Sequence, residues 1–134
     1  MAESVTLETA RTVIDAARAK AEEIGTPMDI AVVDAGGNLT AFARMDGAWL
    51  GSIDIAMGKA YTARAFDMPT DALGAEAQVG EQIFGINTTN NGAVVIFGGG
   101  IPLTDGDRIV GAVGVSGGLV AQDVEVAQAG ADAF

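Results

Sequence analysis

The sequence predicts an α+β domain in which helices cover the faces of an antiparallel sheet. Three observations lead to this prediction. Apolar residues recur at helical spacing towards both ends of the chain, and two pairs of apolar runs are each joined by a short glycine-containing turn. Strands joined by tight turns pair antiparallel, and an antiparallel sheet with helices segregated on its faces is typical of the α+β class.

The first predicted helix follows Thr6, a residue type that caps helix N-termini. Its apolar stripe consists of Leu7, Ala10, Ile14, Ala17, Ala21 and Ile24. Gly25 and Pro27 end it. Residues 28–35 (MDIAVVDA) then predict a largely buried strand, and a Gly-Gly-Asn turn leads to its antiparallel partner at 39–45.

A second helix is predicted from about residue 52 to 66. Its apolar residues wrap most of the circumference, which indicates burial on more than one side: Ile53, Ala56, Met57, Ala60, Ala63 and Phe66. A Met-Pro pair breaks it, and Thr70 or Asp71 is suited to cap a short helix around 71–77. Residues 78–91 predict at most a helical turn near 81–84 and then a polar loop.

The most informative segment is residues 98–118, GGGIPLTDGDRIVGAVGVSGG. Asp105-Gly106 between two apolar runs predicts a hairpin, and residues 93–97 predict a strand that leads into it. These three strands and the earlier pair make five. A final helix follows, marked by Val120, Val124, Ala127, Ala131 and Phe134. Glycine weakens strands unless something approaches the backbone closely, so the hairpin should lie against a ligand, a helix or a second subunit.

Composition excludes several classes of protein. The chain has 134 residues, 49% of them hydrophobic, which is too apolar for general disorder. Its net charge of -11 and lack of a basic stripe argue against binding nucleic acid or an anionic membrane. The apolar runs are too short to cross a bilayer. The first residues do not combine a basic and an apolar segment, so we expect no secretory signal and a cytoplasmic protein.

Cysteine and histidine are both absent from the sequence. This excludes disulfides, a thiol nucleophile, a Ser-His-Asp triad and zinc sites of the Cys/His kind. Haem cannot be held by histidine or cysteine either. We assign no metal site, because a metal would need oxygen ligands or methionine.

Lys59 is an unusual residue in its predicted helix, since it falls on an apolar face. A buried lysine must extend to solvent, pair with an acid or meet a ligand. The structural interpretation is an ion pair with Asp46, Asp54 or Glu81. The functional interpretation is a contact to an anionic ligand or a proton-transfer role. Arg44 and Asp46 leave the second strand together, where a loop can present their charges.

Two glycine-rich points and one aromatic residue are further candidates. Gly98, Gly99 and Gly100 can offer backbone amides to an anion or admit a flat ligand, or they are a bulge that geometry requires. Ser116, placed before the last helix, is either part of an anion site or the helix cap. Tyr61 can close a pocket or pack between subunits.

Two separated motifs, RMDGAWLGSIDIAMGKAYTARAF and GGGIPLTDGDRIVGAVGVSGG, resemble the GlcG/HbpS-like family, which also occurs as the C-terminal domain of PduO-type proteins. The resemblance spans nearly the whole chain, so residues 1–134 are expected to form one such domain. It implies a profilin-like α-β-α sandwich around a five-stranded antiparallel sheet. It also implies homo-oligomers, from dimers to octamers, and a ligand pocket near Arg44, Asp46, Lys59 and residues 98–100.

Some members of that family bind or degrade haem, which gives the first functional hypothesis: an oligomeric protein that binds a small molecule of the tetrapyrrole class. Without histidine, the iron ligand would be Tyr61, Lys59, a methionine or a hydroxyl. The alternative is a metal-independent enzyme acting on a small organic acid, epoxide or carbonyl compound. Its acid-base chemistry would use Lys59 and Arg44 with Asp46 or Glu81. A third hypothesis is a scaffold protein whose glycines serve oligomer packing.

Overall fold

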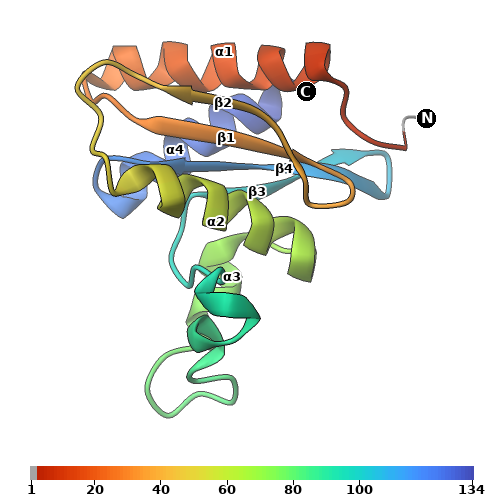
Figure 1. The fold of residues 1–134 in the computed structure, drawn as a ribbon, viewed down its shortest axis with the longest axis vertical. Helices are drawn as coiled ribbons and strands as arrows, with labels where there is room; N and C mark the ends of the chain where they lie inside the picture. The colour runs from red at the N-terminus through yellow and green to blue at the C-terminus, as the bar shows by residue number, and fades with distance from the viewer. Residues whose placement is uncertain (1–2) are drawn as a thin grey trace.

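A computed structural model describes residues 3–134 and shows a four-stranded antiparallel sheet covered by helices on both faces (Figure 1). The elements are α1 (Leu7–Ile24), β1 (Asp29–Asp34), β2 (Leu39–Arg44), α2 (Ser52–Phe66), α3 (Thr70–Ala75), two short 3-10 turns, η1 (Ile86–Thr88) and η2 (Asn90–Gly92), β3 (Gly100–Asp105), β4 (Arg108–Ser116) and α4 (Val120–Asp132). The predicted α+β class and both hairpins are confirmed.

The strand order is β2-β1-β4-β3, and every neighbouring pair is antiparallel. The sheet therefore consists of two hairpins, β1–β2 and β3–β4. They pair with each other through β1 and β4, which are the two central strands. Residues that face each other across an antiparallel pair point to the same face of the sheet. At one end this register aligns Arg44, Asp29 and Ser116 in a single row.

The expected fifth strand is wrong, because residues 93–97 pair with no strand of the sheet. Their backbone bonds instead to a helix. The hydroxyl of Thr62 donates to the carbonyl of Ala93 and accepts from the amide of Val95. Val94 is buried by this packing. The apolar residues that suggested a strand therefore serve contacts with α2.

Two apolar layers lie on opposite faces of the sheet. Alternate residues of the central strands, including Ile30, Val32, Val113 and Val115, point to the layer formed by α1 and α4. The residues between them, including Ala31 and Ala112, point to the opposite face and contact small residues of α2. Because both faces are covered, the middle of β1, residues 30–33, is apolar without alternation.

The small residues on the α2 side bring this helix close to the sheet. A Cβ atom placed on Gly114 would lie 2.1 Å from the carbonyl oxygen of Ala56 and 2.4 Å from the amide nitrogen of Ala60. No side chain fits there, so glycine in β4 is explained by helix packing. This is one of the three explanations that the sequence left open.

Both ends of α1 follow the sequence signals, whereas the start of α3 does not. Thr6 caps α1 by accepting from the amide of Thr9, as predicted, and Gly25 closes the helix in the left-handed conformation. Neither of the predicted residues caps α3, which instead begins after Pro69. The hydroxyl of Thr70 is turned inwards and accepts from the amide of Gly100.

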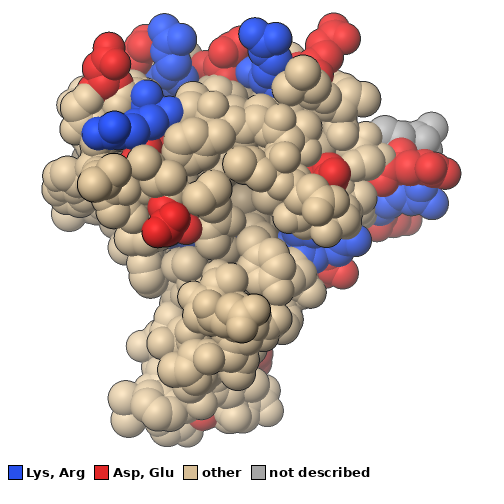
Figure 2. Space-filling model, viewed as in Figure 1, with Lys and Arg blue, Asp and Glu red and all other residues tan. Residues whose placement is uncertain are grey.

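Residues 76–93 project from one end of the layered core, as the green segment in Figure 1 shows. In the view of Figure 2, acidic and basic side chains lie over α1 and along the right-hand edge, and this projecting segment is mostly uncharged. Its side chains include Val79, which is 87% exposed, and Phe84, which is 65% exposed. Among residues 3–134, none of the helices has the length and apolarity needed to cross a membrane.

Candidate functional site

Lys59 is fully buried in α2, as its place on an apolar helix face predicted. Its Nζ donates to Asp123 Oδ2 at 3.0 Å and to the carbonyl oxygen of Val115 at 2.8 Å. It also lies 4.9 Å from the centre of the Phe97 ring. Burial lowers the pKa of Lys59, and the carboxylate of Asp123 opposes that shift.

The acid that pairs with Lys59 is none of the three acids considered from the sequence. Asp123 lies in the first turn of α4, and its other oxygen accepts from the amide of Gly118. The pair therefore links α2, α4 and the end of β4 inside the protein. The charged groups of Lys59 and Asp123 are therefore paired with each other and hydrogen-bonded to the backbone.

The glycine triplet lies around this pair and is buried. A Cβ on Gly99 would lie 2.6 Å from Lys59 Nζ, and one on Gly100 would lie 2.4 Å from the Lys59 carbonyl oxygen. The amide of Gly100 donates to Thr70, and the carbonyl of Gly99 accepts from Val115. Gly98 is equally confined, with a Cβ position 2.6 Å from a methyl group of Val124. These contacts are internal packing and do not face the hollows described below.

The structure does not bring the proposed acid-base residues together. Lys59 is enclosed, whereas Asp46 and Glu81 are exposed in two different loops. The guanidinium of Arg44 donates to the carbonyl of Ala48, at 3.2 and 3.3 Å, and so holds the loop after β2. Ser116 ends β4 and does not cap α4. Its hydroxyl lies 3.1 Å from that of Ser52, at the start of α2.

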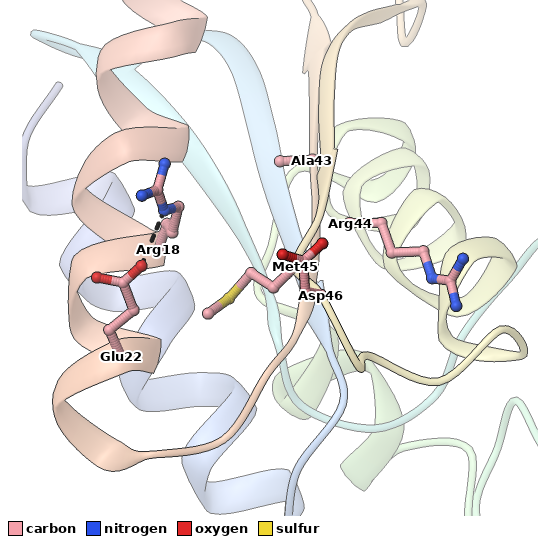
Figure 3. A pocket seen from close by; sticks show the side chains of 6 residues that line it. All are labelled: Arg18, Glu22, Ala43, Arg44, Met45 and Asp46. Carbon is pink, nitrogen blue, oxygen red and sulfur yellow. Dashed lines mark hydrogen bonds and ion pairs between the residues drawn. The ribbon is translucent and has the colours of Figure 1, made fainter.

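One surface hollow, of about 490 Å³, lies between α1 and the end of β2. Figure 3 shows the Arg18–Glu22 ion pair on one side and Met45 and Asp46 on the other, with Arg44 pointing away. Four of the six lining residues are charged: Arg18, Glu22, Arg44 and Asp46. A pocket for an apolar ligand usually has few charged groups, so this hollow is poorly suited to one.

A second hollow, of about 470 Å³, lies on the outer side of α2 against residues 92–95. Its apolar lining comes from Ile55, Met57, Tyr61 and Val95, and Asp54 stands at the N-terminal end of the helix. The hydroxyl of Tyr61 accepts a hydrogen bond from Asn90 Nδ2 at 3.0 Å. Tyr61, a candidate identified from the sequence, therefore lines this apolar hollow, whereas the candidates Arg44 and Asp46 line the charged one.

A third hollow, of about 230 Å³, is also bordered by Tyr61. It is bounded by the Gly36-Gly37 turn and by Arg64. The ring and the turn are neighbours, since a Cβ on Gly37 would lie at an ordinary contact distance, 3.9 Å, from Tyr61 Cδ1. Because Tyr61 borders both spaces, we treat the two hollows together as the α2 groove.

Sequence reasoning missed three residues of the α2 groove, although a signal for them exists. Asp54, Met57, Tyr61 and Arg64 follow one another at spacings of three or four, which places them on one face of α2. The sequence had assigned Met57 to the apolar stripe. The structure gives it both roles, since it packs against the core and borders the groove.

The family described as haem degrading protein HbpS-like matches residues 5–132, which is nearly the whole chain. The chain belongs to the HbpS-like family. The resemblance seen in the two sequence motifs is therefore confirmed.

Three relatives illustrate the range of HbpS-like proteins. A 15.0 kDa protein of the dhaT-dhaS intergenic region of Citrobacter freundii is 42% identical, over 98% of this chain and 92% of that protein. The corrinoid adenosyltransferase PduO of the same organism is 40% identical over 84% of this chain, which matches 34% of PduO. The crystal structure of a PduOC–haem complex has a TM-score of 0.93 and 34% identity, covering 97% of this chain and 94% of that one.

Among HbpS-like proteins, this chain must use a restricted set of groups for any haem iron. Tyrosine and methionine are both haem ligands in known proteins, and the α2 groove contains one of each, Tyr61 and Met57. Lys59, the other candidate, is enclosed by its ion pair. The α2 groove is therefore the place where a ligand atom, an apolar wall and free space coincide.

Proposed function

We propose that this protein is a homo-oligomeric small-molecule-binding protein that takes up a tetrapyrrole, haem first among them, in the α2 groove. The observation that carries the proposal is the position of Tyr61 and Met57 in one apolar hollow of an HbpS-like chain. The PduOC relative, which is bound to haem in its crystal structure, supports the choice of ligand class.

The residues of the groove fit haem in two respects. Ile55, Val95 and the edge of Met57 offer an apolar wall to a flat macrocycle. The phenol oxygen of Tyr61 points to a donor, Asn90, and a hydrogen bond to that oxygen stabilises the negative charge that binding to iron(III) requires. When bound, haem would supply a redox-active iron centre; Tyr61 would hold the iron and Met57 would contact the ring.

The size and openness of the groove support the oligomeric part of the proposal. The larger hollow, about 470 Å³, lies within the range of small-molecule sites, which begins at about 300 Å³, and the smaller hollow, about 230 Å³, extends it beside Tyr61. Both are open to solvent on one side, so one copy of the chain covers one face of a flat ligand. A second copy would cover the other face and keep the macrocycle from water.

Titration with haemin, followed by the Soret absorption band, tests this function. We expect a saturable shift in the wild type, at least about tenfold weaker binding in Tyr61→Phe, and a smaller loss in Met57→Leu. Met45→Leu is the matched control, because Met45 lies in the charged hollow of Figure 3. The proposal fails if the wild type shows no saturable shift, or if Tyr61→Phe binds haemin like the wild type.

A further inference from the structure

The geometry points to Arg64 as the residue that recognises carboxylate groups of the ligand and orients it in the α2 groove. This inference rests on the proposed function and adds a chemical class: a flat, apolar molecule with acidic groups on one edge. Arg64 lies in the last turn of α2 and borders the smaller hollow, next to the ring of Tyr61.

The guanidinium of Arg64 is held in place and retains donors for a ligand. Its Nε donates to the carbonyl of Ala35 at 2.6 Å, and one terminal nitrogen, Nη1, donates to Asp67. The other terminal nitrogen, Nη2, has no hydrogen-bond partner among residues 3–134. The side chain is 28% exposed. A rigid guanidinium with unused N–H groups is well suited to bind a carboxylate.

Charges at the two ends of the groove differ in sign. Asp54 stands at the N-terminal end of the α2 stripe and Arg64 ten residues later, with the apolar side chains of Met57 and Tyr61 between them. Asp67 offsets the charge of Arg64 through their ion pair. A ligand carboxylate is therefore repelled at Asp54 and accepted at Arg64 by hydrogen bonds from the unused N–H groups of Nη2. The apolar body of the ligand then lies in the larger hollow, so the groove selects one orientation of the ligand.

A comparison of two porphyrins tests this role. Protoporphyrin IX carries two carboxylates, and its dimethyl ester has the same ring without them. Binding of each can be followed by porphyrin fluorescence, with the wild type, Arg64→Gln and Asp54→Asn, after each variant's fold is checked by circular dichroism. We expect the wild type to bind the diacid about tenfold more tightly than the ester. Arg64→Gln should bring that ratio close to one by weakening the diacid alone.

Two further variants keep the test decisive. Arg18→Gln removes a guanidinium from the charged hollow and should leave the ratio unchanged. Asp54→Asn should raise affinity for the diacid and leave the ester unaffected, and it answers the question if Arg64→Gln does not fold. Equal binding of diacid and ester by the wild type overturns the inference while leaving tetrapyrrole binding intact, as does an undiminished ratio in Arg64→Gln. Absence of binding by both porphyrins overturns the proposed function itself.

Discussion

At the scale of single residues, Asp29 is an acidic side chain in an unfavourable, buried environment. It is fully buried at the start of β1, and neither carboxylate oxygen has a hydrogen-bond partner among residues 3–134. Burial raises the pKa of Asp29, and the positive charge of Arg44, in the neighbouring strand, opposes the shift. The neutral carboxyl is therefore favoured in the folded protein more than in the unfolded chain.

This predicts how stability depends on pH. A carboxyl with a raised pKa in the folded state contributes fully below its unfolded value of 3.8, and the contribution is lost as pH rises through the folded value. Asp29→Asn should therefore gain stability relative to the wild type as the pH rises above about 4. Urea unfolding across that range measures the difference. Asp15→Asn, on the exposed side of α1, should track the wild type. Parallel curves for Asp29→Asn and the wild type would refute the prediction.

For Lys59, the sequence predicted the need for a partner but not which residue it is. A lysine on an apolar helix face is visible in the sequence, and so is its need for a partner. The partner is not visible, because Asp123 lies 64 positions later in a different helix. Choosing among Asp46, Asp54 and Glu81 favoured acids near in sequence, whereas antiparallel sheets bring distant segments together. Tyr61 was identified from the sequence because an aromatic residue near polar loops indicates a pocket or a subunit contact.

At the scale of elements, helix periodicity and turn chemistry predicted nearly all of the fold. Both hairpins and the helices α1, α2 and α4 lie where the pattern placed them, because each depends on local signals such as Thr6, Gly25 and Asp105-Gly106. The wrong strand at 93–97 has a tertiary cause. Its apolar residues pack on α2 through hydrogen bonds with Thr62, which no local signal reveals.

The contact of α2 with β4 is the element-scale feature most sensitive to mutation. Gly114→Ala should reduce the free energy of unfolding by about 3 kcal/mol or more, because the new methyl group meets the backbone of α2. Gly51→Ala is the matched control, since no atom lies within 4 Å of its Cβ position. Urea denaturation of both variants measures the difference. Equal stability of the two would show that α2 is not packed as closely as described.

At the scale of the whole molecule, the projecting segment of residues 76–93 is one of the places where large apolar side chains are exposed in a single copy. It exposes Val79 and Phe84 on a mostly uncharged surface (Figure 2). Exposed apolar side chains in such a segment are typical of protein contacts. The homo-oligomer that we propose would cover these side chains. The sequence did not indicate this role, because it predicted little more than a polar loop there.

Light scattering after gel filtration tests this contact. The wild type should have the mass of an oligomer, and the double variant Val79→Ser, Phe84→Ser should shift towards a monomer. Leu7→Ser, which changes another exposed apolar residue at the start of α1, should keep the wild-type mass. A monomeric wild type, or a double variant with unchanged mass, would refute the role of this segment.

The central claim is that a tetrapyrrole binds beside Tyr61, and the position of the iron tests it most directly. A crystal of the protein grown with haemin, measured at the iron absorption edge, gives that position from the anomalous signal. The account predicts an iron peak in the α2 groove, next to the phenol oxygen of Tyr61, with the acidic edge of the porphyrin turned towards Arg64. An iron peak in the charged hollow near Met45, or bound haem with its iron away from Tyr61, would contradict it.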